Sequence, residues 1–142
     1  MSKKSLDFES FRKLHRKALE ENFPGRTQAF WGKQESKIVI IGQAPSQSGI
    51  KNQKPWFDKS GEKMINSWFF VSQDIFYNQD LFYLTALGLY FPGKNKKGGD
   101  AKPSLVWAET WLRREVKYLK PEIFLVVGAM AANFFFPKKE FK

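Results

Sequence analysis

The sequence contains no cysteine and only one histidine, His15. Without cysteine, the chain can form no disulfide, no thiolate nucleophile and no cysteine-ligated iron–sulfur cluster. A single histidine is also too few for the usual histidine-based zinc site. We therefore expect the protein to work without a metal ion or any other cofactor.

Long hydrophobic runs are absent as well. The first four residues, MSKK, are not followed by the apolar segment of a signal peptide, and no stretch approaches the roughly 20 apolar residues of a membrane-spanning helix. We expect a soluble, cytoplasmic protein with no membrane partner. The chain of 142 residues is long enough for one domain, 1–142, with a hydrophobic core of its own.

Negative charge is scarce, because 14 acidic residues stand against 24 basic ones and give a net charge of +10. This excess favours a polyanion such as nucleic acid as partner, although a lysine-rich surface also keeps a protein in solution. Aromatic residues, in contrast, make up 17% of the chain, and 15 of them are phenylalanine. They can stack on nucleic-acid bases, but filling a core is their more common use.

Hydrophobic periodicity predicts alternating helices and strands. The helices are expected at residues 7–22, 61–71, 104–119 and 129–135, and the strands at residues 37–42, 81–87 and 122–128. The strands are apolar without alternation, as parallel strands covered on both faces are. The sequence therefore predicts an α/β fold, a three-layer α/β/α sandwich with a short parallel sheet.

Each predicted helix has an apolar face that we expect to point inward. The expected inward residues are Phe8, Phe11, Leu14, Ala18 and Leu19 in the first helix, Met64, Ile65, Trp68 and Phe69 in the second, and Leu105, Ala108, Leu112, Val116 and Leu119 in the third. His15 lies between Arg12–Lys13 and Arg16–Lys17 in the sequence. We expect this histidine to be a surface residue, since a catalytic one needs a partner and a cleft.

Ligands of open parallel sheets bind outside the carboxyl ends of the strands. Three connections leave those ends: the loops 42–60 and 88–103 and the turn after Gly128. The first carries Trp56 and Phe57, and the second combines glycines with Lys94, Lys96 and Lys97. Aromatic rings on one loop and a basic glycine loop on the next suit a flipped base held beside its phosphates. The alternative is a pair of surface loops rich in turn residues.

The segment GQAPSQSG, residues 42–49, is neither a P-loop nor a dinucleotide-binding fingerprint. With KPWFDKSG, LTALGLYFPG and PEIFLVVGAMAA, which follow it in this order, it resembles the motifs of the uracil-DNA glycosylase superfamily. The resemblance extends over residues 36–132. It is similar to a branch of small members with a Y-P-G-x-x-x-x-G-D loop, matched by YFPG at 90–93 and GD at 99–100.

The resemblance implies a uracil-DNA glycosylase-like fold and a role in base-excision repair. DNA, either uracil-containing or single-stranded, would be the partner, and the reaction would be hydrolysis of an N-glycosidic bond. The resemblance also assigns site residues by position. The water and the nucleotide would be held by Gly42, Gln43, Ala44 and Pro45. The base would stack on Trp56 or Phe57, and its edge would face Ala86. The phosphates would be bound by Lys94, Lys96 and Lys97.

Several positions depart from the family pattern. The family's carboxylate falls at Gln43 or Ala44, and its base-reading asparagine falls at Ala86. Gln43 can hold a water by hydrogen bonds but cannot act as a base. Asp58 is the nearest carboxylate in the loop, and it either acts as the acid or base or only orders the loop. The family's last strand and its His-Pro-Ser loop have no counterpart here, so the domain is expected to be short at its carboxyl end, with the strand 122–128 exposed on one side.

Four hypotheses follow for the function. The first is a glycosylase in which Gln43 places the water. The second is a DNA-binding module that has lost catalysis, and the third is an incomplete relic of the fold without activity of its own. The fourth is a flavodoxin-like protein that binds phosphate or a nucleotide, which shares the strand order but not the segment 55–57.

Overall fold

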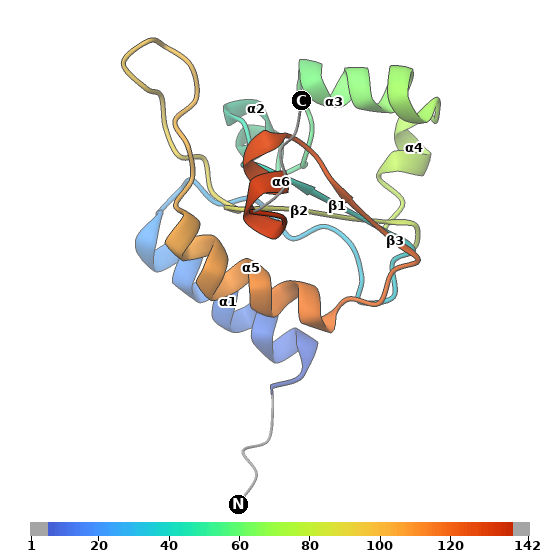
Figure 1. Ribbon diagram of the computed structural model, residues 1–142, viewed down its shortest axis with the longest axis horizontal. Helices are drawn as coiled ribbons and strands as arrows, with labels where there is room; N and C mark the ends of the chain where they lie inside the picture. The colour runs from blue at the N-terminus through green and yellow to red at the C-terminus, as the bar shows by residue number, and fades with distance from the viewer. Residues whose placement is uncertain (1–5, 138–142) are drawn as a thin grey trace, which may run out of the picture.

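Three parallel strands form the centre of the computed structural model, which describes residues 6–137. β1 (Ile38–Gly42) lies in the middle, between β2 (Phe82–Ala86) and β3 (Ile123–Val126). In register, Ile38 pairs with both Phe82 and Ile123. The carboxyl ends of the strands therefore meet at one edge of the sheet, with helices on both faces (Figure 1).

β1 is buried on both faces because its β-branched side chains alternate between two cores. Val39 and Ile41 contact one cluster, and Ile40 contacts the other. Only the first residue, Ile38, is partly exposed. This confirms the prediction of a strand that is apolar without alternation.

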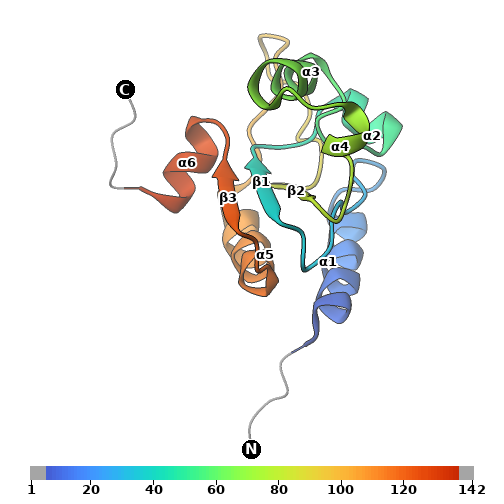
Figure 2. The same ribbon diagram turned by 90° about the vertical axis from the view of Figure 1, so that its right-hand side faces the viewer.

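One face of the sheet is covered by α1 (Phe8–Asn22) and α5 (Leu105–Tyr118), which lie beside each other (Figures 1 and 2). Each helix begins at a side-chain cap. Asp7 accepts a hydrogen bond from the backbone N–H of Ser10 at 2.7 Å, and Ser104 accepts one from that of Trp107 at 3.1 Å. Both helices confirm the periodicity of the sequence to within one residue at each end.

The buried face of α1 differs from the expected one, because its stripe is Phe8, Phe11, His15 and Leu19. The prediction that His15 is a surface residue is therefore wrong: its side chain is 2% exposed, and its ring stacks on Trp111 with a centroid distance of 4.9 Å. The imidazole fills a core position as an aromatic ring. Leu14, one residue earlier, is displaced from this stripe and is 43% exposed.

The opposite face is covered by four short helical segments. They are α2 (Gln47–Asn52), α3 (Lys59–Lys63), the π-helix η1 (Met64–Phe69) and α4 (Gln73–Phe76). The predicted helix 61–71 is thus a turn of α-helix followed by a π-helix. The wider turn of a π-helix changes which side chains face the core. Met64 and Ile65 are buried and Phe69 contacts the core as expected, but the prediction for Trp68 is wrong, because it is 55% exposed.

β3 forms an edge of the sheet within residues 6–137, and Ile123 and Phe124 are 48% and 44% exposed. This confirms the expected exposure of the third strand on one side. α6 (Ala129–Phe135) follows directly and buries Ala131 and Phe134 in the core beneath α5. None of the helices within residues 6–137 has the length and apolarity of a transmembrane segment.

α5 also carries two departures from the expected stripe. Ala108, Leu112 and Leu119 are buried, but Leu105 at its amino end is 48% exposed. Glu115, a charged residue, is buried instead. The sequence pattern gave the correct helix and missed its polar core residue.

Candidate functional site

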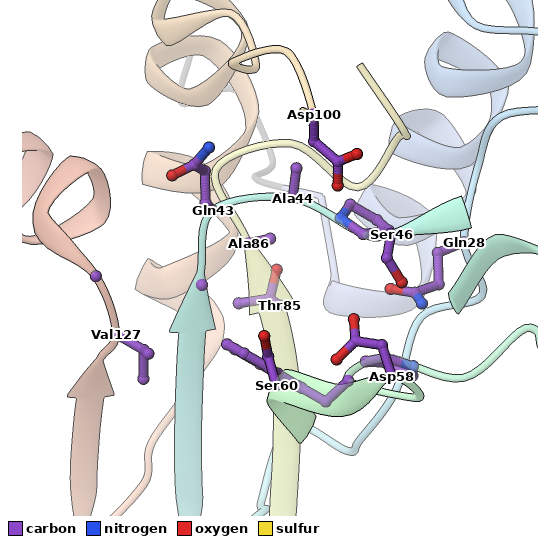
Figure 3. A pocket seen from close by; sticks show the side chains of 15 residues that line it. Gln28, Gln43, Ala44, Ser46, Asp58, Ser60, Thr85, Ala86, Asp100 and Val127 are labelled. Carbon is purple, nitrogen blue, oxygen red and sulfur yellow. The ribbon is translucent and has the colours of Figure 1, made fainter. Parts of the chain in front are cut away.

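A cavity of about 290 Å³ opens at the carboxyl ends of the three strands (Figure 3). Its walls come from the loop after β1, the segment before α3, the end of β2 and the turn after β3. Gln28 and Asp100 complete it from more distant parts of the chain. This is the place where an open parallel sheet is expected to bind a ligand.

The loop after β1 begins at a glycine because an aromatic ring lies against it. A Cβ atom at Gly42 would come within 2.7 Å of Cζ2 of Trp56. The indole therefore covers the end of β1 and forms one wall of the cavity. Trp56 adopts φ = 60°, a left-handed conformation that is uncommon for a bulky residue.

The segment Pro55–Asp58 is held from both ends. A Cβ atom at Gly61 would overlap the carbonyl oxygen of Trp56, so only glycine fits there. The Tyr77 hydroxyl donates a hydrogen bond of 2.7 Å to the carbonyl oxygen of Pro55. Burial and the nearby charge of Asp58 raise the pKa of Tyr77 to about 12, so this donor keeps its proton at neutral pH.

Asp58 lines the cavity and caps α3 at the same time. Its Oδ1 accepts a hydrogen bond of 2.8 Å from the backbone N–H of Gly61. The side chain is half-buried and points into the cavity, toward Ser60 and Thr85 (Figure 3). A carboxylate has a second oxygen that can bind water or a ligand. The role in ordering the loop and a role in chemistry are therefore compatible.

Trp56 lines the cavity at the end of the sheet, whereas Phe57 does not. Phe57 lines a neighbouring cavity of about 260 Å³, together with Ile65 and Tyr77. The ammonium nitrogen of Lys54 lies 5.6 Å from the centroid of the Phe57 ring and 5.1 Å from that of Tyr77. Of the two aromatic candidates, the structure brings only Trp56 to the end of the sheet.

Gln43, Ala44 and Pro45 all line the cavity, but they contribute differently. Pro45 is buried and Ala44 is half-buried. Gln43 is exposed, and its amide projects away from Asp58 and the other polar groups of the cavity (Figure 3). In this arrangement Gln43 does not face the polar part of the cavity.

The end of β2 gives the cavity a methyl group and a hydroxyl. Ala86 presents its methyl group, which cannot form a hydrogen bond. Thr85 is buried, and its Oγ1 donates a hydrogen bond of 3.1 Å to Oε1 of Glu115. The Tyr83 hydroxyl donates to the other carboxylate oxygen at 2.6 Å. Burial raises the pKa of Glu115 to about 7, against these two donors and the charge of Arg12, which lower it.

The basic loop projects from the molecule between β2 and α5 (Figure 1). Lys94 forms an ion pair of 2.7 Å with Asp100, which itself lines the cavity. Asn95 orders the tip by accepting hydrogen bonds from the backbone N–H groups of Lys97 and Gly99. The charge of Lys94 is thus matched by a carboxylate, whereas Lys96 and Lys97 stand exposed at the tip.

The sequence analysis assigned no role in the site to five polar residues that line the cavity: Gln28, Ser46, Ser60, Thr85 and Asp100. Ser46, Ser60, Thr85 and Asp100 lie within the quoted motifs, so the motifs themselves carried a signal. Gln28 precedes the first motif and gave none. Within residues 6–137, no three His, Asp or Glu side chains gather in a group that could hold a metal ion.

The model of the uracil DNA glycosylase superfamily matches residues 30–141. The chain belongs to this superfamily. The match includes the strands, the loop with Trp56 and Asp58, and the basic loop, so every residue that lines the cavity except Gln28 lies within the match. Membership also decides against the flavodoxin-like alternative. Membership of the superfamily implies a DNA substrate.

Proposed function

We propose that the protein binds DNA and takes one base, uracil, out of the stack into the cavity, where the N-glycosidic bond is hydrolysed. The observation that carries the proposal is the pairing of a carboxylate with an aromatic wall at the end of the sheet. Asp58 points into the cavity that Trp56 closes on one side. Enzymes that act on a base must extrude it into such a pocket.

The dimensions of the cavity favour a single nucleotide. Its volume of about 290 Å³ is at the lower end of the range of roughly 300–1,000 Å³ for small-molecule sites. A base that enters it would meet the Trp56 indole, and stacking on an aromatic side chain contributes about 1–3 kcal/mol per base. The indole lies against Gly42 and the Trp56 backbone lies against Gly61, so the ring needs little further ordering when a base binds.

Hydrolysis of the glycosidic bond creates positive charge on the sugar and negative charge on the departing base. A water attacks C1′, the C–N bond breaks, and the base leaves with the bonding electron pair. The Asp58 carboxylate can accept the proton of the water and stabilise the cationic sugar. The released base then takes up a proton from solvent.

The charge of the surface supports a DNA partner. The net charge is +10, and Lys96 and Lys97 extend on the loop whose base carries Asp100 at the cavity. Lysines so placed can bind the phosphates beside an extruded nucleotide. Binding should therefore weaken as the salt concentration rises.

A second function, a DNA-binding module without catalysis, is favoured by two positions. Gln43 replaces the carboxylate expected after β1 and points away from the polar groups of the cavity. Ala86 replaces the amide expected at the end of β2. In this alternative the cavity holds a base but does not release it.

A base-release assay distinguishes the two. Uracil-containing single- and double-stranded oligonucleotides are incubated with protein, abasic sites are cleaved with alkali, and binding is measured in parallel at two salt concentrations. Asp58→Asn should abolish release and still fold, because asparagine also caps helices well. Asp74→Asn on α4 is the matched control and should retain release.

The outcomes are separable. Release that survives in Asp58→Asn would refute the role of Asp58. Salt-sensitive binding without release by the wild-type protein would establish the binding module. Absence of both would reject DNA as the partner.

A further inference from the structure

Gln28 is fixed in the segment between α1 and β1 by its backbone. Its N–H donates a hydrogen bond of 3.1 Å to the carbonyl oxygen of Leu89, and the preceding residue, Thr27, is bridged to Tyr90. These contacts hold the segment against the connection that follows β2. The side chain of Gln28 is thereby directed to the cavity, on the side of Ser46 and Asp58 (Figure 3).

The amide of Gln28 is buried without a partner. The residue is 6% exposed, and its Nε2 has no hydrogen-bond partner within residues 6–137. Buried amide groups in folded proteins are nearly always hydrogen-bonded, so an orphaned one requires an explanation. Its position on a cavity wall offers one, because a bound ligand can supply the missing partner.

The neighbouring helix leaves room for this amide. A Cβ atom at Gly49 would lie 2.9 Å from Nε2 of Gln28, which is closer than real Cβ contacts come. Any other residue at this position of α2 would displace the amide. The glycine and the glutamine therefore form one arrangement that keeps a polar group at the cavity.

We propose that the Gln28 amide reads the edge of the base held in the cavity. A primary amide presents both donors and an acceptor. This set matches a uracil edge, where a carbonyl oxygen accepts and the adjacent ring N–H donates. Ala86, at the end of β2, cannot make these bonds. The identity of the ligand rests on the proposed function. The observation that the Gln28 amide lacks a partner is independent of that function.

Binding measurements test the assignment. The probes are two labelled single-stranded oligonucleotides of one sequence. One carries a central uracil on a 2′-fluoro sugar, whose fluorine disfavours the cationic sugar and keeps the base attached, and the other carries a tetrahydrofuran abasic analogue. The readout is the ratio of their dissociation constants. Gln28→Met keeps the length of the side chain and removes the amide. We expect it to lower the preference for uracil by about 3- to 10-fold, the worth of one or two neutral hydrogen bonds. Gln47→Met, on an exposed residue of α2, is the matched control and should leave the ratio unchanged.

Gln28→Glu provides a second, chemically distinct readout. A carboxylate only accepts hydrogen bonds. The carbonyl oxygen of uracil therefore loses the N–H donor that the glutamine supplied, while the amino group of cytosine gains an acceptor. We expect the preference between otherwise identical uracil and cytosine oligonucleotides to move toward cytosine. An unchanged preference in both Gln28 variants would overturn the assignment.

Thermal unfolding without DNA separates a ligand-binding role from a structural one. Removal of an unpartnered buried amide should raise the melting temperature of Gln28→Met by roughly 2–5 °C. A structural role predicts a lower melting temperature together with an unchanged uracil preference, and that result would refute the inference. If the wild-type protein itself binds uracil and abasic DNA equally, the proposed function fails, and the inference that rests on it fails as well.

Discussion

Two buried titratable groups should have opposite effects on the free energy of unfolding as the pH falls. His15 is enclosed by aromatic rings, and burial, with the nearby Arg114, lowers its pKa from 6.5 to about 3. Burial raises the pKa of Glu115 from 4.5 to about 7. The stability that depends on neutral His15 is complete above pH 6.5 and is lost as the pH falls toward 3. The stability that depends on protonated Glu115 is complete below pH 4.5 and is lost as the pH rises through 7.

The magnitudes follow from these values. Between pH 7 and pH 5 the unfolded chain protonates His15 and the folded chain does not, so the free energy of unfolding decreases by about 2 kcal/mol. Over the same interval the folded chain protonates Glu115 ahead of the unfolded chain, which increases the free energy of unfolding by about 2 kcal/mol. The two contributions nearly cancel in the wild-type protein. Substitution of one group should therefore reveal the pH dependence that the remaining group causes.

Urea unfolding, followed by tryptophan fluorescence at pH 5, 6 and 7, measures this effect. Relative to wild type, His15→Phe should gain about 2 kcal/mol between pH 7 and pH 5, and Glu115→Gln should lose about as much. The double variant should recover the wild-type slope. The comparison uses the slope of the free energy of unfolding against pH, so a packing cost that does not change with pH has no influence. The remaining carboxylates are common to all variants and affect each slope equally. A slope of His15→Phe equal to that of wild type would refute the buried neutral histidine.

Two further predictions concern DNA. Trp56→Ala should weaken binding to uracil-containing single-stranded DNA by about 1–3 kcal/mol in a titration at fixed salt, and an unchanged affinity would show that the indole is not a base platform. The double substitution Lys96→Ala/Lys97→Ala should reduce the slope of log K against log [salt] by about 1 to 2. The reason is that the variant lacks two phosphate contacts, so its binding releases fewer counterions from the DNA. Lys94→Ala is the comparison and should reduce the slope less, since Asp100 already neutralises this lysine; equal effects would contradict the assignment of the loop tip.

The layered fold could be predicted because its main elements are defined by local pattern. β1 is a run of β-branched residues, and α1 and α5 repeat apolar residues every three or four positions. α2 and α4 were missed because they are only six and four residues long, and each is begun by one serine cap, Ser46 and Ser72. Such short segments depend on the surrounding contacts more than on periodicity.

The cavity could be placed from the sequence, but its polar lining could not. Parallel strands end at one edge, so the loops with Trp56 and Asp58 had to meet there. The direction of a side chain is a different matter. Phe57 and Trp56 are adjacent, yet only Trp56 reaches the cavity at the end of the sheet, and its backbone is left-handed. Neither composition nor motif spacing predicts the left-handed backbone angle of Trp56.

The polar residues hidden in the core show where pattern reasoning fails and what distinguishes a site. His15 and Gln28 both have buried nitrogen atoms without partners within residues 6–137. His15 is surrounded by the rings of Phe11, Phe30 and Trp111, and its neutral ring serves as an aromatic core residue. Gln28 has no such compensation, since an amide is a poor hydrophobe and this one lines an open cavity. An orphaned polar atom therefore indicates a ligand only where a cavity offers that ligand a place, and of these two residues Gln28 alone meets the condition.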